Sequence, residues 1–114
     1  MLNKMKGYRA ERNVKINFVK NGWKVIRAGG SLGEYDIIAF KGGKCIFIQI
    51  KSTNRKKFYY YGYMDDQYEG FPFRLVVHFD RGKTVILSPQ KIVSEEDGVA
   101  LDDFLLKWDE NSFQ

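Results

Sequence analysis

Cysteine, histidine and proline are scarce in this 114-residue sequence, which contains one, one and two of them, respectively. The single cysteine, Cys45, cannot form an internal disulfide and cannot build a thiolate zinc site. The single histidine, His78, stands between two apolar residues, so we expect a structural position for it rather than a catalytic one. The sequence therefore excludes an internal disulfide scaffold and a cysteine-ligated zinc centre.

Long apolar runs are also missing. No run approaches the roughly 18 residues of a transmembrane helix, and the first residues lack the apolar core of a signal peptide. Hydrophobic residues nevertheless make up 44% of the chain, an ordinary share for a globular protein. We expect one domain over residues 1–114, in a cytoplasmic protein without membrane contacts or a small-molecule cofactor.

Acidic residues are fewer than basic ones, 14 against 19, which gives a formal net charge of +5. Basic residues concentrate near the N-terminus and again at 51–57, just before a run of aromatic residues. This distribution favours nucleic acid as the partner. The aromatic run either stacks on bases or only covers a sheet, and the pattern leaves both open. The expected nucleic-acid contacts are Lys4, Lys6, Arg9, Arg12, Arg27, Arg55, Lys56 and Lys57.

Hydrophobic periodicity predicts a helix near each end of the chain. Ala10, Val14 and Phe18 recur every four residues within a helix over about 8–20, and Gly22 is its expected C-terminal cap. A closing helix is expected from apolar residues at helical spacing, namely Leu101, Phe104, Leu105 and Trp108.

Sequence patterns in the middle of the chain predict β-strands. Runs rich in β-branched and aromatic residues predict strands over 23–28, 34–41, 44–51, 73–79 and 84–88. Ser88 followed by Pro89 predicts the start of a short helix. The order of elements predicts a mixed α/β (α+β) domain in which helices flank a central mixed β-sheet.

A Gly-Gly pair at 42–43 predicts a two-residue hairpin turn between two of these strands. In that register Asp36 faces Gln49, and Glu34 faces Lys51. Because side chains alternate along a strand, all four lie on one face at the open end. A core hairpin has no need of a carboxylate, an amide and an ammonium there, and we interpret them as a metal-dependent nuclease site.

Phosphodiester hydrolysis needs a hard divalent cation held by oxygen atoms, which polarises the phosphate and lowers the pKa of an attacking water. Asp36 can bind the ion directly, Gln49 offers its amide oxygen, and Ile50 offers its main-chain carbonyl. Glu11 approaches from the first helix, directly or through a water, although a solvated boundary position is the alternative. Lys51 supplies positive charge for the negative charge that develops.

Four segments in order carry a family resemblance: KGYRAER (6–12), GWKVIRAGGS (22–31), DIIAF (36–40) and QIKS (49–52). Over these segments the sequence resembles the archaeal-type Holliday junction resolvases of the restriction-endonuclease-like superfamily, with its Asp…(Asp/Glu)-x-Lys signature. The resemblance implies a restriction-endonuclease-like fold and an endonuclease of DNA recombination and repair that resolves four-way junctions with Mg²⁺ or Mn²⁺. It also implies a homodimer that nicks two strands symmetrically, and an archaeal or viral origin.

The resemblance assigns roles to matching positions. Glu11 corresponds to the helix acid of the metal site, Asp36 to the central metal ligand and Lys51 to the active-site lysine. Arg12 and Arg27 match basic positions of the family, and a loop serine matches as well. The expected catalytic residues are Glu11, Ser31, Asp36, Gln49 and Lys51, and the expected metal ligands are Glu11, Asp36, Gln49 and Ile50.

Gln49 departs from the family, which has an acid at this position. Three explanations stay open: a natural variant that binds metal through its amide oxygen, a laboratory Glu-to-Gln change that traps an inactive state, or a relative that binds DNA without cutting. Glu34 offers a fourth, by supplying the missing carboxylate. The stretch after Lys57 lacks the pattern of the long helix that follows these strands in cellular resolvases, which bears on the usual dimer interface.

Three hypotheses about function result. The first is a structure-selective endonuclease for four-way junctions, the second a nucleic-acid-binding module with a weakened site, and the third a nuclease of this fold acting on another DNA substrate. The first predicts paired nicks in a junction, the second bound but uncut DNA, and the third cleavage without junction preference.

Overall fold

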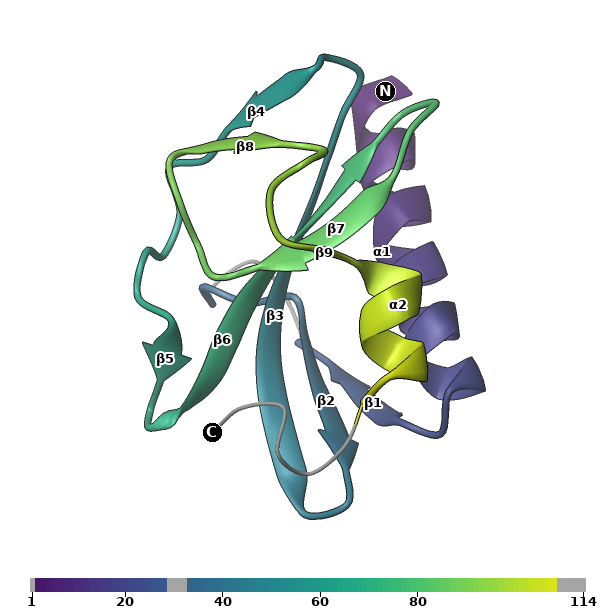
Figure 1. The fold of residues 1–114 in the computed structure, drawn as a ribbon, viewed down its shortest axis with the longest axis vertical. Helices are drawn as coiled ribbons and strands as arrows, with labels where there is room; N and C mark the ends of the chain where they lie inside the picture. Colours follow the sequence, from purple (N-terminus) through teal and green to yellow (C-terminus); the bar gives the residue numbers. More distant parts are fainter. Residues whose placement is uncertain (1, 29–32, 109–114) are drawn as a thin grey trace.

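The chain forms a mixed β-sheet with both helices on one of its faces (Figure 1). The structure is a computed structural model and describes residues 2–28 and 33–108. The predicted mixed α/β architecture with a central mixed sheet is confirmed. In chain order the elements are α1 (Leu2–Lys20), β1 (Lys24–Arg27), β2 (Ile37–Lys41), β3 (Lys44–Thr53), β4 (Lys57–Tyr59), β5 (Gln67–Tyr68), β6 (Phe71–Phe79), β7 (Thr84–Leu87), β8 (Ile92–Ser94), β9 (Val99–Ala100) and α2 (Leu101–Leu106).

The sheet runs in the order β1-β2-β3-β6-β7-β9, with β5 paired to β6 outside that path. Strands β3 and β6 are parallel, and the other paired strands of this sheet are antiparallel. A parallel pair cannot be joined by a tight turn, so the chain leaves β3 and returns through β4 and β5. Strand β3 spans 10 residues and carries Gln49, Ile50 and Lys51 toward its C-terminal end.

Helix α1 ends where its sequence predicts. Gly22 has a φ of 89°, and its amide donates to the carbonyl of Val19 at 3.1 Å, while the amide of Trp23 donates to that of Phe18 at 3.0 Å. These bonds form a Schellman cap, in which glycine takes the left-handed position without steric penalty. The rings of Phe18 and Trp23 pack edge to face, 5.3 Å between centroids, and close the cap. The helix begins at Leu2, whereas the prediction began it at about residue 8. The prediction missed residues 2–7 because they lack the apolar periodicity on which it relied.

The Gly-Gly hairpin has the predicted register, with Lys41 opposite Lys44. The predicted strand extends too far, because β2 begins one residue after Asp36, although Asp36 still meets Gln49 through their side chains. The ladder stops there since the side chain of Asp36 accepts the amide of Ile50 at 2.7 Å, in the place of a backbone carbonyl. This local break places the carboxylate of Asp36 beside β3, just before the first residue of β2.

Apolar side chains fill both faces of the sheet. On the face opposite the helices, Tyr60 and Val93 pack with Leu75, Val77 and Phe79 of β6. Burial of one side chain of this size contributes about 1.5–3 kcal/mol to the free energy of folding. The apolar layers on both faces therefore stabilise the sheet. On the helix side the buried residues include Ala10, Val14, Phe18, Ile37, Ala39, Ile46, Ile48, Ile50, Leu101 and Leu105.

The layer opposite the helices is a small second sheet that the sequence patterns did not predict. Strand β4 pairs with β8, Phe58 opposite Val93, and beyond it the amide of Tyr60 donates to the carbonyl of Lys91 at 2.8 Å. The helix predicted from Ser88 and Pro89 is wrong, because the chain after them turns into β8 and pairs along β4.

Three further features of the fold concern expectations from the sequence. No helix lies in the described stretch between β3 and β6, as the pattern after Lys57 indicates. His78 lies on β6 with its Nδ1 2.8 Å from Oγ1 of Thr84, its cross-strand neighbour on β7, which is a structural position. Neither helix, over the residues described, is long and apolar enough to cross a membrane.

Candidate active site

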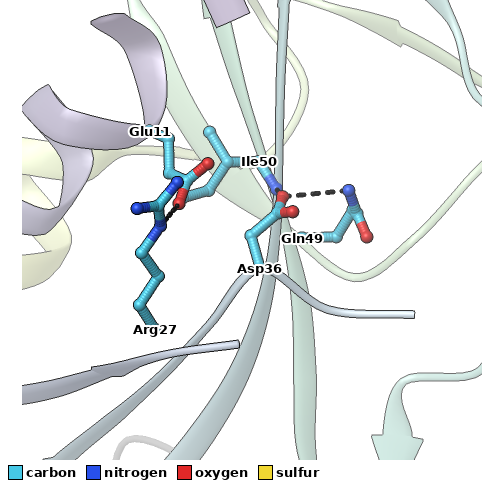
Figure 2. Close-up of polar contacts among 5 residues, drawn as sticks. All are labelled: Glu11, Arg27, Asp36, Gln49 and Ile50. Carbon is cyan, nitrogen blue, oxygen red and sulfur yellow. Dashed lines mark hydrogen bonds and ion pairs between the residues drawn. The ribbon is translucent and has the colours of Figure 1, made fainter. Parts of the chain in front are cut away.

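Two of the polar residues predicted from the hairpin, Asp36 and Gln49, meet where β2 begins beside β3 (Figure 2). The carbonyl of Asp36 accepts the amide of Ala28 at 2.9 Å, and its amide donates to the carbonyl of Ile48 at 2.7 Å. Its carboxylate oxygen Oδ2 accepts two bonds, from Gln49 Nε2 at 2.9 Å and from the amide of Ile50 at 2.7 Å. Asp36 therefore links β1 to β3, and its carboxylate is held in a defined orientation.

Asp36 is half-buried, and its ionised form is disfavoured there. Burial raises the pKa of its carboxyl above the ordinary value of 3.8, and the charge of Glu11 adds to the rise. The hydrogen bond from the Ile50 amide lowers the pKa, as do the positive charges of Lys51 and Arg27, without cancelling the effect of burial. A cation beside the carboxylate would favour its ionised form and so oppose the effect of burial.

Glu11 extends from α1 toward Asp36 and pairs with Arg27 of β1, whose Nε donates to Oε1 at 2.8 Å (Figure 2). The side chain of Arg27 is 56% exposed and that of Glu11 is 23% exposed. An ion pair in such a position is worth about 1 kcal/mol or less. Glu11 can therefore exchange Arg27 for a cation, and Arg27 can exchange Glu11 for a phosphate, with little loss of stability.

Gln49 meets Asp36, as the hairpin register predicts, but it does so as a hydrogen-bond donor. Its amide nitrogen points at the carboxylate because an ionised carboxylate can only accept. To ligate a cation the amide would have to turn so that Oε1 replaces Nε2, which breaks the 2.9 Å bond to Asp36. The amide gives Oδ2 of Asp36 a neutral donor, whereas an acid at this position would bring two carboxylates together and favour a proton or a cation between them.

A pocket of about 450 Å³ opens beside Gln49. Gln49, Lys51 and Glu34 contribute its polar wall, and residues 58–63 contribute an aromatic one. Lys51 is exposed, and its charge lowers the pKa of Asp36. The side chains that the sequence placed on one face thus do gather at one site, although Glu34 reaches it from outside the strand.

Tyr60 belongs to this site and was not predicted. It is 1% exposed, and its hydroxyl donates to the carbonyl of Tyr63 at 2.8 Å. Burial raises the pKa of Tyr60 to about 12, and the negative charges of Asp36 and Glu34 add to the rise. Its hydroxyl therefore stays protonated at neutral pH. Three consecutive tyrosines, residues 59–61, give no local signal for which of them is buried, so the sequence could not single it out.

The oxygen atoms at the site fit a hard divalent cation. The described residues contain no group of three His, Cys, Asp or Glu side chains able to hold a metal ion, so Glu34 gains no support as a third acid. Two acids, Glu11 and Asp36, remain, with neutral oxygens from Gln49 and Ile50. Mg²⁺ commonly takes one or two carboxylates and completes its coordination with waters and substrate phosphates. The donor set therefore fits an ion that shares its coordination with a bound substrate.

Basic residues surround Glu11. Arg12, Lys15 and Arg27 line a pocket of about 190 Å³ together with Glu11, so three cations face one acid. Lys15 was not predicted from the sequence. It lies four residues after Glu11 on α1, a spacing that places the two side chains next to each other on a helix and could have indicated it. The second predicted basic group, residues 55–57, is exposed, with Arg55 and Lys56 between β3 and β4 and Lys57 at the start of β4. Both groups are accessible to an anionic partner.

The remaining predicted residues lie near the N-terminus and at position 31. Arg9 is exposed on α1. The side chains of Lys4 and Lys6, and the whole of Ser31, lie outside the described part of the chain. Their roles stay predictions.

The fold has counterparts among solved nucleases. The structure of Hjc, a Holliday junction resolvase from the archaeal hyperthermophile Archaeoglobus fulgidus, matches with a TM-score of 0.69, covering 92% of this chain and 99% of that one at 19% identity. A bacterial homing endonuclease, I-Ssp6803I, matches with a TM-score of 0.56, covering 79% and 72% at 17% identity. At these identities the likeness shows the fold, which is restriction-endonuclease-like.

A family model gives the finer assignment. The model described as archaeal Holliday junction resolvase (Hjc) matches residues 2–105. The chain therefore belongs to the archaeal Holliday junction resolvase family, a family of nucleases, and the resemblance carried by the four sequence segments is confirmed well beyond residue 52. Among curated protein sequences, none matches the chain.

Proposed function

We propose that this protein is a metal-dependent, structure-selective DNA endonuclease that resolves four-way junctions by hydrolysing phosphodiester bonds. The observation that carries the proposal is Asp36, a half-buried carboxylate with a raised pKa, near Glu11, Gln49 and Lys51. Membership of the junction resolvase family supports the choice of substrate. Because branched DNA arises inside cells, we expect a cytoplasmic protein.

In this proposal Glu11, Asp36, Gln49 and the carbonyl of Ile50 would hold Mg²⁺ or Mn²⁺. Such an ion, when bound, polarises the scissile phosphate and lowers the pKa of water. Asp36 has the strongest reason to bind it, since burial penalises its uncompensated charge. Gln49 would turn its Oε1 toward the site, and Glu11 would leave its exposed pair with Arg27.

Lys51 would act on the substrate rather than on the ion. Its exposed ammonium lines the same pocket as Gln49, where it can contact the phosphate oxygens on which negative charge develops. Its charge also lowers the pKa of Asp36 and so favours the ionised ligand. Ser31, expected from the family pattern, would assist the same reaction.

The basic residues would hold the DNA backbone. Arg12, Lys15 and Arg27 form one cluster beside Glu11, and residues 55–57 form another. Each phosphate that a lysine or arginine neutralises makes binding more sensitive to salt. A homodimer, as the family resemblance implies, would present two such sites to the two strands that a resolvase nicks.

The test is incubation of the protein with a labelled four-way junction and with a linear duplex of the same arm sequence, each with and without Mn²⁺. We expect paired nicks in the junction, only with metal, and little cutting of the duplex. Gln49→Glu should bind Mn²⁺ about tenfold more tightly or better, because it adds a negative charge to the ligand set. Cutting without metal would refute the ion site, and equal cutting of junction and duplex would favour another DNA substrate.

A second candidate function, DNA binding without cleavage, is favoured by one specific contact. Gln49 presents its neutral amide nitrogen, and not an oxygen, to Oδ2 of Asp36 at 2.9 Å, where the family pattern has a second acid. This alternative predicts that the chain shifts a junction in a gel and leaves it uncut with Mn²⁺. Cleavage that appears only in Gln49→Glu would establish it.

A further inference from the structure

Two tyrosines beside the candidate site project into solvent. Tyr59 is 53% exposed and Tyr61 is 85% exposed. Over the residues described, neither ring packs against another aromatic ring, whereas Tyr35, Tyr63 and Tyr68 pack in one cluster. Packing within the fold therefore accounts for the clustered tyrosines. It does not account for two large aromatic rings exposed at Tyr59 and Tyr61.

The segment that carries them is held in place by Tyr60. Its amide donates to the carbonyl of Lys91, and its hydroxyl donates to the carbonyl of Tyr63, both at 2.8 Å. Gly62 passes so close over the ring that a Cβ there would lie 2.5 Å from the Tyr60 hydroxyl oxygen. Since side chains alternate along an extended chain, a buried Tyr60 turns both neighbouring rings outward. The two exposed rings thus start from an ordered backbone, which lowers the entropy lost when they bind.

Tyr59 and Tyr61 are both among the residues that line the pocket of about 450 Å³ whose polar wall includes Gln49 and Lys51. Its size lies within the range of about 300–1,000 Å³ that is usual for small organic ligands. Because Gln49 and Lys51 belong to the site proposed to act on the scissile phosphate, the group best placed to fill the pocket is the nucleoside attached to that phosphate. Glu34 on the same wall would repel a second phosphate but would not repel a neutral base.

We propose that this pocket receives an unstacked nucleobase next to the cleaved phosphate, with Tyr61 as the main stacking surface and Tyr59 as the second. The inference rests on the proposed nuclease function and adds a source of substrate selectivity to it. Stacking on an aromatic ring tolerates any base, because every base has a π face. In a linear duplex each base is paired and stacked on both sides, whereas a base at a branch point is cheaper to unstack. The pocket therefore favours branched DNA without reading its sequence.

Tyr61→Ala tests the proposal by its effect on binding in metal-free buffer, where no cutting occurs. The side chain is 85% exposed, so its loss does not threaten the fold. We expect about tenfold weaker binding of a four-way junction, the loss that removal of one stacked base corresponds to, and unchanged binding of a linear duplex. Tyr61→Phe keeps the ring and should bind as the native chain does. Leu106→Ala, which truncates another exposed apolar side chain (75% exposed, on α2), should change neither affinity.

An abasic residue placed on either side of the cleaved phosphate completes a double-mutant cycle between protein and DNA. At one of the two positions it should cost the native chain about tenfold in affinity and cost Tyr61→Ala nothing further. Equal losses in both proteins, or a loss in Tyr61→Ala that is the same for junction and duplex, would overturn the base pocket. If the native chain nicks junctions and Tyr61→Ala matches it throughout, only the base pocket is wrong. If the native chain shows no junction preference and no nicking, the proposed function is wrong as well.

Discussion

Replacing Gln49 by glutamate should make the stability of the fold depend on a divalent cation. In the structure Nε2 of Gln49 donates to Oδ2 of Asp36 at 2.9 Å. Glutamate removes that donor and sets a second carboxylate against the first. Two ionised carboxylates at this distance repel each other by about 6 kcal/mol at an effective dielectric constant of about 20.

Protonation limits this cost. At pH 7 the penalty cannot exceed the free energy of protonating a glutamate with an ordinary pKa of about 4.3, which is about 4 kcal/mol. Rotation of a half-buried side chain reduces it further, so we expect the variant to lose about 1–3 kcal/mol without metal. For a chain of this length that corresponds to a Tm lower by about 4–12 °C.

Thermal unfolding followed by circular dichroism, at pH 5 and pH 7 with EDTA or Mn²⁺, measures the effect. The variant should regain stability as the pH falls, because the carboxylate pair then shares a proton, and it should regain it at pH 7 when Mn²⁺ is added. Gln49→Met removes the same donor without adding charge and should show a smaller response to metal. A Gln49→Glu chain as stable as the native one in EDTA at pH 7, and unmoved by Mn²⁺, would refute the adjacency of residues 36 and 49.

Asp36→Asn should raise the stability at neutral pH, because burial raises the pKa of Asp36 and its ionised form is disfavoured in the folded state. The gain should vanish as the pH falls through the raised pKa toward 3.8, and a gain that persists in acid would contradict this cause. Arg27→Ala removes an exposed pair with Glu11 and should change the free energy of unfolding by about 1 kcal/mol or less. It should also lower the salt slope of DNA binding by about one, and an unchanged slope would mean that Arg27 holds no phosphate. Gly98→Ala should cost more than about 2 kcal/mol in denaturant titrations, since its φ is 71° and a Cβ would lie 2.5 Å from a carbonyl oxygen of β7. Gly43→Ala, with φ of 78° and nothing within 4 Å, should cost less, and equal costs would refute the close approach.

The hairpin shows how much of the candidate site local patterns can predict. A two-glycine turn leaves one register for β2 and β3, so the meeting of Asp36 and Gln49 follows from counting residues away from the turn. The capped end of α1 follows in the same way from Gly22 and the ring of Trp23 after it. In both cases the residues that decide the geometry are near one another in the chain.

The aromatic wall of the site could not be predicted by such means. Strands β4 and β8 are far apart in the sequence, with β5, β6 and β7 between them, and no turn joins them. Their pairing depends on where Tyr60 and Val93 pack on the sheet. Such tertiary packing between distant segments leaves no local sequence pattern. The burial of Tyr60, the outward direction of Tyr59 and Tyr61, and the pocket beside Gln49 all depend on that pairing, so they were missed together.

The central claim is that Asp36 is the metal-binding centre of a site that cuts four-way DNA junctions, and cleavage by Asp36→Ala tests it most directly. With Mn²⁺ and a labelled junction, the native chain should give paired nicks. Because loss of a residue that only supports a ligand already costs about 10–100-fold, loss of a direct ligand should cost the variant more than about 100-fold in rate. Its salt-sensitive binding of the junction should remain. Cutting by Asp36→Ala at the native rate would contradict the account.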